Sequence, residues 1–357
     1  MTILWFTLIL VSITAWMARY FSVAAVKAPI FISPNKFLAF LAASSLVIVS
    51  GLRQNIGDTS LYVHSYEIGD FSWESILQQR DKGFNILQLL LKQISDDPQI
   101  LIFFTALATN LLIAGVFFKY ARLFELSMYL YITTGAFIVS MNGIRQFLAA
   151  AIVFSATKFI FEGSWKRYMA LVLLGSVFHQ SALVMIPIYF IVRRKAWTGM
   201  TFALLSLAVL IVAGFNQFST LLFTAIKDTQ YGHYESFQEG GANVIRVIVC
   251  SIPVVIAFFG REKLRKIFPH GDIVVNLSIV GVVLMIISTQ NWIFARLSIY
   301  FSLYQLLLFG WIVKLFREKD QKLVYLAIIA FYFIYFFYEN FIILNIYYLS
   351  KYLIWPL

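Results

Sequence analysis

The chain has 357 residues, of which 61% are hydrophobic and only 13% are charged. A soluble domain carries roughly 25% charged residues, so this composition excludes a soluble fold. The formal net charge of +11 does not indicate a nucleic-acid partner, because the basic residues are spread over short loops, as in membrane proteins. The sequence therefore predicts a protein of the lipid bilayer.

The apolar stretches are continuous rather than alternating, as in Ile152–Phe161 and Leu323–Tyr338. Alternation would indicate transmembrane strands, whereas helices satisfy their own backbone groups in lipid. The predicted fold is therefore all-α and polytopic, a single transmembrane domain over residues 1–357 with about 11 or 12 transmembrane helices. The expected spans are roughly residues 2–20, 37–52, 99–118, 125–140, 143–161, 168–192, 197–214, 244–260, 273–289, 294–316 and 323–340, with 341–357 as a short surface helix.

The first stretch, Thr2–Tyr20, lacks a basic start and a small-residue cleavage site, so we expect a retained helix rather than a signal peptide. The loop after it carries Arg19, Lys27 and Lys36 and is assigned to the cytoplasmic side by the positive-inside rule. The next loop, 53–98, has four basic and seven acidic residues, which suits the outer side.

Residues 168–192 decide the topology of the rest of the chain. A single crossing there would put Arg193–Lys195 and every later basic cluster outside. A re-entrant pair of short helices, broken at His179-Gln180-Ser181, keeps all of them inside. Non-helical backbone is tolerated at membrane depth where it is buried in protein or lines a watery cavity. We therefore expect a broken helix pair.

With this topology, the polar segments 53–84, 141–146, 179–181, 216–243 and 289–296 all share the outer face. The loops 53–98 and 215–243 are expected to form part of an active site. Tyr231–Glu235, within the second loop, suits a carbohydrate-facing lid, although ordinary loops have the same composition.

Four arginines are predicted at the outer ends of spans: Arg53, Arg145, Arg246 and Arg296. Each could extend to the lipid headgroups, but arginine is scarce on this side of a membrane. Guanidinium groups match phosphate oxygens in a two-pronged geometry, so the cluster could hold a lipid diphosphate as it leaves. Arg145 begins a helix, where its charge opposes the helix dipole, so a carboxylate or a phosphate is expected beside it.

Three further polar positions could take part in chemistry. Asp58 could accept a proton or a sugar hydroxyl hydrogen bond, or could cap the helix that follows it. His179 has the pKa range of a general base, although a lone histidine is often only hydrogen-bonded. Tyr62 and Tyr66 share one helix face and could stack on a sugar or form part of an interfacial aromatic belt.

The sequence does not predict a metal site. Its four histidines form no close cluster with cysteine or acidic residues, so a zinc site is not expected. No cofactor is expected either, because arginines can supply the charge stabilisation that a metal would give.

Taken together, five motifs resemble the EpsG family, a branch of the Wzy-type polysaccharide polymerases, in order and spacing along nearly the whole chain. They are R-x-x-x-G-D-T-x-x-Y from Arg53 to Tyr62, D-K-G-F from Asp81 to Phe84, N-G-I-R-Q from Asn142 to Gln146, H-Q-S-A-L from His179 to Leu183, and R-x-x-x-Y from Arg296 to Tyr300. The second departs from the E-P-G-F/Y of many relatives, since the acid is shorter and the proline is replaced by Lys82.

The resemblance implies a GT-C-like glycosyltransferase that joins undecaprenyl-diphosphate-linked repeat units into surface polysaccharide, such as O-antigen or exopolysaccharide, on the outer face of a bacterial cytoplasmic membrane. It also implies a chain-length regulator as a partner. We expect Arg145 and Arg296 to bind the diphosphate, with Arg53 or Arg246 assisting. His179 or Asp58 is expected to act as the base, and His179 is preferred over Asp58. The other expected substrate-binding residues are Gln146, Tyr62, Tyr66, Asp81 and Tyr300.

Two other functions remain open from the sequence. A lipid-linked oligosaccharide flippase or exporter would also be polytopic and basic, but it would be expected to carry internal symmetry, and none is visible. A membrane O-acyltransferase that modifies a surface glycan could use an intramembrane histidine.

Overall fold

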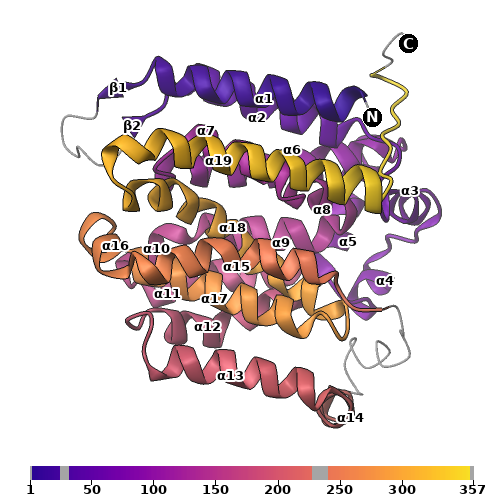
Figure 1. The fold of residues 1–357 in the computed structure, drawn as a ribbon. Coiled ribbons are helices and arrows are strands. Elements are labelled where there is room, and N and C mark those ends of the chain that lie inside the picture. The colour runs from indigo at the N-terminus through magenta and orange to yellow at the C-terminus, as the bar shows by residue number, and fades with distance from the viewer. Residues whose placement is uncertain (1, 25–31, 227–239, 354–357) are drawn as a thin grey trace. The chain divides into compact units, whose positions relative to one another are not determined.

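The computed structural model describes residues 2–24, 32–226 and 240–353. The chain divides into two compact units, whose helices are labelled in Figure 1. Unit 1 comprises Met1–Tyr189 and Phe309–Leu357, and unit 2 comprises Phe190–Leu308.

Nearly all of the described secondary structure is helical, which confirms the predicted fold class. The exception is an antiparallel pair of two-residue strands, β1 (Val23–Ala24) and β2 (Ile32–Ser33). The helices that lie in unit 1, or enter it, are α1 (Thr2–Tyr20), α2 (Lys36–Gly51), α3 (Thr59–Ile68), α4 (Trp73–Gln78), α5 (Lys82–Lys92), α6 (Gln99–Tyr120), α7 (Phe124–Thr133), α8 (Ala136–Asn142), α9 (Ile144–Ser155), α10 (Thr157–Glu162), α11 (Trp165–Phe178), η1 (Gln180–Val184), α12 (Met185–Val192), α19 (Glu318–Phe337) and η3 (Tyr338–Ile343). Those of unit 2 are α13 (Gly199–Ala213), α14 (Phe215–Ile226), α15 (Val244–Phe259), α16 (Arg261–Ile267) and α17 (Gly271–Ile287), followed by α18 (Ile293–Leu315), which ends in unit 1.

The chain is a polytopic membrane protein. Within the described ranges, α1, α6, α18 and the segment Glu318–Ile343 are long and apolar enough to cross a bilayer. Three bent pairs can each form one span: α7 with α8, α13 with α14, and α15 with α16, bent by 56°, 98° and 82°. Shorter apolar helices cover Lys36–Gly51, Ile144–Ser155, Gln180–Val192 and Gly271–Ile287.

The predicted break at residues 168–192 is present. Helix α11 ends at Phe178, His179 is extended with φ −158° and ψ 118°, and η1 and α12 follow. The rings of Tyr168 and Tyr189 lie 5.0 Å apart, whereas one straight helix would separate these positions by roughly 30 Å. The chain therefore folds back on itself at His179, as the charge map requires.

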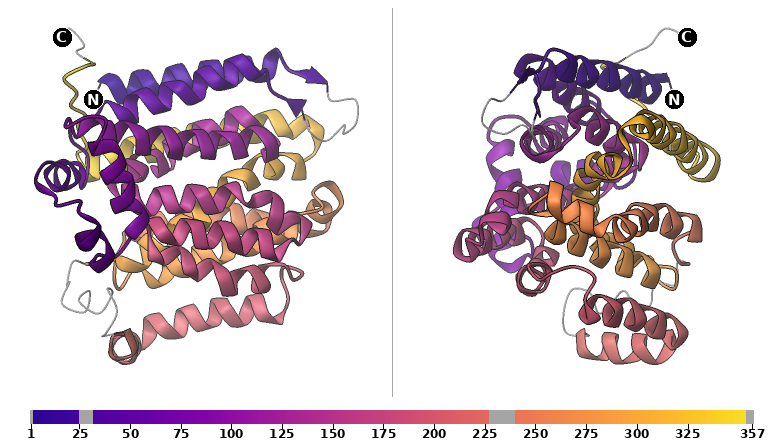
Figure 2. Two further views of the ribbon diagram at one scale, coloured as in Figure 1. Left: turned by 180° about the vertical axis from the view of Figure 1, so that it is seen from behind. Right: turned by 60° about the vertical axis from the view of Figure 1, so that its left-hand side comes forward.

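The helices of unit 1 run between two opposite ends (Figure 2), and polar contacts mark each of them. At one, the basic end, Arg19 of α1 pairs with Glu125 of α7, and Asn35 donates its N–H to the Ala18 carbonyl. The bent pair α7–α8, roughly 25 Å of helix, leads from Glu125 to the other end. There Arg53 after α2 donates to the Met141 carbonyl. We call this second end the cavity end.

The C-terminal segment differs from the expected surface helix over 341–357, so that prediction is wrong. Helix α19 continues into a single π-helical turn, η3, and the chain then runs extended along the loop after α2. Gln54 N donates to Leu349 O at 2.9 Å, and the Asn55 carboxamide bonds Tyr347 O at 2.8 Å and Leu349 N at 2.7 Å. The Asn55 side chain thus both donates to and accepts from the backbone of the C-terminal segment, as a neighbouring strand would. These hydrogen bonds take the place of the backbone hydrogen bonds of a helix.

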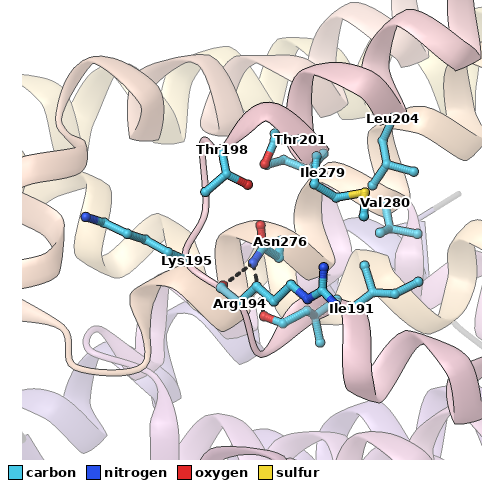
Figure 3. A pocket seen from close by; sticks show the side chains of 11 residues that line it. Ile191, Arg194, Lys195, Thr198, Thr201, Leu204, Asn276, Ile279 and Val280 are labelled. Carbon is cyan, nitrogen blue, oxygen red and sulfur yellow. Dashed lines mark hydrogen bonds between the residues drawn. The ribbon is translucent and has the colours of Figure 1, made fainter.

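Unit 2 is organised around α17, against which α13 and α15 pack. Its core includes Ala208, Ile287 and Phe294. Where α13 and α17 approach the loop after α12, Asn276 donates to the carbonyls of Val192 and Arg194 at 3.0 and 2.7 Å (Figure 3). The pocket beside Asn276 measures about 20 Å³, room for about one water molecule, so it is too small to hold a substrate.

Candidate functional site

A cavity of about 570 Å³ lies at the cavity end of unit 1. This volume is within the roughly 300–1,000 Å³ of small-molecule sites. We call it the Arg145 cavity. It is lined by Asp58, Leu61, Tyr62, Ser65, Gln78, Gln79, Arg80, Phe84, Asn85, Gln88 and Arg145. Three of the residues predicted from the sequence, Asp58, Tyr62 and Arg145, are therefore brought together around one space.

Arg145 has the anionic neighbour that its position at a helix start predicts. Its Nη1 lies 3.2 Å from Oδ2 of Asp81, and the other carboxylate oxygen accepts the Gln180 N–H at 3.2 Å. The Asp81 side chain is 4% exposed and that of Arg145 is 43% exposed. The guanidinium also lies 5.8 Å from the ring centres of both Tyr62 and Phe84. Asp81 thus orients the guanidinium of Arg145 through Nη1, while the Arg145 side chain as a whole remains partly exposed.

The D-K-G-F motif sets this geometry. Asp81 has φ 53°, in the left-handed region, and α5 begins directly after it. A Cβ on Gly83 would lie 2.5 Å from Val177 Cγ1, so only glycine allows α5 to approach α11 this closely. Burial raises the pKa of Asp81, with Arg145 and the Gln180 N–H acting in the opposite direction. Lys82 is exposed at the first position of α5.

Arg53 is 1% exposed, and its hydrogen bonds go to the protein. Nε donates to Thr59 Oγ1 at 3.1 Å, Nη2 to Met141 O at 2.7 Å, and Nη1 to the Ser50 carbonyl. Burial lowers its pKa to about 10, so it stays charged at neutral pH. The geometry makes Arg53 a support for the loop after α2, whereas sequence reasoning expected an assisting phosphate contact.

The position of Asp58 is fixed by contacts between its own motif, Arg53 to Tyr62, and the N-G-I-R-Q motif that begins at Asn142. Gly57 has φ +55°, and a Cβ there would lie 2.1 Å from Asn142 Oδ1, so the turn requires glycine. The same Asn142 oxygen accepts the Asp58 N–H at 2.9 Å. Asp58 precedes α3, but its side chain makes no capping hydrogen bond to that helix. The carboxylate is therefore placed at the cavity by its backbone rather than used as a cap.

His179 lies beside the cavity wall, outside the set of lining residues. Gln146 Nε2 donates to Ser181 Oγ at 3.3 Å, and Ser181 Oγ lies 2.7 Å from His179 Nδ1. The Ser181 backbone N–H also points at Nδ1, at 3.4 Å. Because a backbone N–H can only donate, Nδ1 is the acceptor, and the network assigns the proton of a neutral ring to Nε2.

Tyr66 is not at the cavity. It is fully buried in a cluster with Phe84 and Leu91, and its hydroxyl donates to Ser95 O at 2.9 Å. In this conformation it presents no surface to a sugar, in contrast to Tyr62.

The remaining predicted residues belong to unit 2. Arg246 is in the first turn of α15, the guanidinium of Arg296 lies 4.5 Å from the Trp292 ring, and Tyr300 is buried in α18. The segments before α15 and after α17 meet, since Ala242 N donates to Ser288 O at 2.7 Å. Residues 231–235 lie outside the described residues. A group of three or more metal-ligating side chains is not found among the residues that are described.

Sequence reasoning missed several cavity residues. Gln78, Gln79, Arg80, Asn85 and Gln88 all belong to the predicted loop 53–98, and sequence reasoning singled out none of them. The i, i+3 spacing of Asn85 and Gln88 puts both side chains on one face of α5, and this spacing could have indicated a shared polar site.

The sequence model of the EpsG family matches residues 36–353, nearly the whole chain. The chain belongs to the EpsG family. No curated protein and no solved structure matches it. EpsG is a family of Wzy-type polysaccharide polymerases, so membership supports a polymerase-type role for this EpsG-family protein.

Proposed function

We propose that this EpsG-family protein is a membrane glycosyltransferase that joins undecaprenyl-diphosphate-linked repeat units into surface polysaccharide. The observation that carries the proposal is the Arg145 cavity, where an accessible guanidinium anchored by Asp81 shares one polar space with the Asp58 carboxylate. Family membership supplies the reaction class.

The proposed active face is the outer face of the bacterial cytoplasmic membrane. Within unit 1, Lys119 and Arg122 flank the basic end, where Arg19 meets Glu125, and the cavity lies at the other end of α7–α8. Basic loops mark the cytoplasmic side, which supports an outward-facing cavity. Lipid-linked repeat units would reach it there.

In the proposed reaction, a hydroxyl of the acceptor sugar attacks the anomeric carbon of the donor glycan. The bond between that carbon and the diphosphate oxygen breaks as the glycosidic bond forms, and the hydroxyl proton passes to a base. The leaving lipid diphosphate gains negative charge, which a fixed guanidinium stabilises more in the transition state than in the ground state. Arg145 takes this role, while Arg246 and Arg296 remain predicted phosphate contacts of unit 2.

The geometry favours Asp58 over His179 as the base. Asp58 lines the cavity, whereas His179 Nδ1 already accepts from Ser181 and its Nε2 carries the proton. In a neutral His179 the one basic nitrogen, Nδ1, is already occupied by the hydrogen bonds from Ser181, and Nε2 can only donate. We therefore assign proton acceptance to Asp58 and give His179 a donor role toward substrate.

Purified protein in liposomes, supplied with lipid-linked repeat units from a strain lacking the gene, tests the proposal. We expect a ladder of longer glycans with wild type and only single repeats with Arg145→Ala. Arg317→Ala, on an exposed arginine of the loop before α19, is the matched control and keeps the ladder. Full activity of both Arg145→Ala and His179→Ala would end this assignment of the site.

The surface glycan of a deletion strain separates the rival functions. A polymerase defect leaves a single-repeat product, loss of an exporter leaves no surface product, and loss of an acyltransferase leaves normal-length glycan without acyl groups. We expect the single-repeat product.

A further inference from the structure

The wall of the Arg145 cavity formed by α5 holds a carboxamide, Gln88, that is 2% exposed. A buried glutamine normally uses both its donor and its acceptor. Here only the donor is used: Gln88 Nε2 donates to Asn85 Oδ1 at 3.1 Å. The Oε1 atom is buried and has no hydrogen-bond partner among the described residues.

The orientation of Gln88 follows from the chain of bonds behind it. Asn85 Nδ2 donates to the backbone carbonyl of Arg80 at 3.0 Å. A carbonyl can only accept, so the Asn85 amide must point its nitrogen at Arg80 and its oxygen at Gln88. Because the Asn85 oxygen can only accept, the amide nitrogen of Gln88 must be the atom that donates to it. These two hydrogen bonds therefore leave Oε1 of Gln88 as the atom without a partner among the described residues.

An unsatisfied buried carbonyl oxygen costs free energy, and a ligand that donates to it recovers that cost. The neighbouring residues indicate what kind of ligand this is. The same cavity carries the polar side chains of Ser65, Gln78 and Gln79 and the aromatic rings of Tyr62 and Phe84. Amides and hydroxyls beside aromatic rings suit a sugar, which has donor hydroxyls at its edge and apolar C–H faces.

We propose that Gln88 forms a sugar subsite, in which its Oε1 accepts a hydrogen bond from a hydroxyl of the repeat unit bound in the Arg145 cavity. Gln88 thereby discriminates between repeat units that present a hydroxyl at this point and those that do not. A site built to bond a hydroxyl rejects analogues that lack it much more strongly than a site built from apolar contacts. This inference rests on the proposed function, because the ligand is the substrate of that reaction.

Gln88→Met tests the subsite directly, because methionine keeps the length of the side chain and removes both polar atoms. We expect the apparent KM for lipid-linked repeat units to rise about tenfold, which corresponds to the loss of one well-placed hydrogen bond, with kcat within about threefold. The control is Gln93→Met, the same substitution on an exposed glutamine just after α5, and its KM stays at the wild-type value.

Gln88→Glu provides a second variant, because a protonated carboxyl group can donate to Asn85 Oδ1 and keep a carbonyl oxygen in the place of Oε1. At about pH 5, where burial keeps such a carboxyl group protonated, its KM is expected to stay within about threefold of the wild-type value at the same pH. Thermal unfolding of each variant in detergent separates binding from folding. We expect Gln88→Met to melt close to wild type, since the unsatisfied Oε1 that it removes offsets the donor that Asn85 Oδ1 loses.

Two probes distinguish the source of the hydroxyl. One is the intact lipid-linked repeat unit, and the other is the same oligosaccharide released from its lipid, which lacks the leaving group and competes only as an acceptor. A weaker response of Gln88→Met to either probe supports the subsite, and the probe that changes identifies the acceptor or the donor sugar.

Wild-type KM values for both probes in a folded Gln88→Met variant would overturn the subsite, while wild-type polymerisation leaves the proposed function intact. A KM of the protonated Gln88→Glu variant, at about pH 5, raised as much as that of Gln88→Met would overturn it as well. Failure of the wild-type protein itself to lengthen glycans would instead overturn the proposed function.

Discussion

Unit 1 contains two ion pairs that look alike in isolation and differ in their surroundings. Arg145–Asp81 and Arg19–Glu125 each join a partly exposed arginine to a nearly buried carboxylate, with side-chain exposures of 43% and 4% in the first and 38% and 2% in the second. Arg145–Asp81 borders a polar cavity of about 570 Å³. Arg19–Glu125 joins the last turn of α1 to the first turn of α7.

This difference predicts separate roles for the two pairs, a structural one for Arg19–Glu125 and a functional one for Arg145–Asp81. Breaking a pair that joins helices costs stability, because it leaves a buried charge without its partner. Breaking one beside a cavity removes a group that substrate can reach. The two roles can be separated by measuring activity and unfolding on the same variants.

The largest expected effect is that of Arg145→Lys on activity. Lysine keeps the positive charge and can still pair with Asp81, but it loses the planar fork that matches a diphosphate. We expect glycan lengthening to fall by about 10²-fold with little change in the melting temperature. A variant with more than half of wild-type activity would place the diphosphate elsewhere.

Arg19→Ala is expected to show the opposite pattern. It leaves Glu125 buried without its ion-pair partner, so the free energy of unfolding should fall by about 1–3 kcal/mol, reduced by the partial exposure of Arg19. Activity per folded molecule should stay within about twofold of wild type. Denaturant unfolding measures the stability and the glycan ladder measures the activity. Lost activity with unchanged stability would contradict the structural role of the Arg19–Glu125 pair.

An effect of intermediate size is expected at the C-terminal segment, which contacts the loop after α2 at the cavity end. Asn55→Leu removes two hydrogen bonds to the extended segment, at Tyr347 and Leu349, and we expect a loss of about 1–2 kcal/mol in stability. Because Asn55 lies three residues before Asp58, we also expect kcat to fall severalfold. The neighbouring, exposed Gln54→Leu keeps its backbone bond to Leu349 and serves as the control. Equal kcat in both variants would show that the segment does not position the Asp58 loop.

The smallest expected effect concerns pH. Burial raises the pKa of Asp81 in the folded protein above its ordinary 3.8, so the folded state binds more protons than the unfolded state between the two values. Stability should therefore decrease as pH rises through that window and level off above the folded pKa. Asp81→Asn should remove this slope, whereas Asp96→Asn, on an exposed carboxylate, should keep it. Identical profiles of stability against pH in wild type and Asp81→Asn would contradict a raised pKa of Asp81 in the folded protein.

Much of the cavity end followed from local chemistry in the sequence. Arg145 at a helix start required an anion, and Asp81 is that anion. The charge pattern required a reversal at His179, and the chain reverses there. Tyr66 and Arg53 could not be assigned in the same way, because their burial depends on the packing of α5 and α8 against them, which no local pattern encodes.

Gln88 and the C-terminal segment show a second limit. Asn85 and Gln88 lie among leucines in α5, and only the fold shows that their face meets a cavity. The segment after η3 is apolar enough for a helix, but long-range bonds to Asn55 determine its extended form. Both features depend on residues far apart in the chain.

The most direct test of the central claim is a side-by-side polymerisation assay of wild type, Arg145→Lys and Arg19→Ala in liposomes, with lipid-linked repeat units as substrate and glycan length read on a gel. The roles assigned to the two ion pairs predict a full ladder for wild type and for folded Arg19→Ala, and single repeats for Arg145→Lys. A full ladder from Arg145→Lys, together with its loss in a folded Arg19→Ala, would place the active site at the basic end and contradict the account.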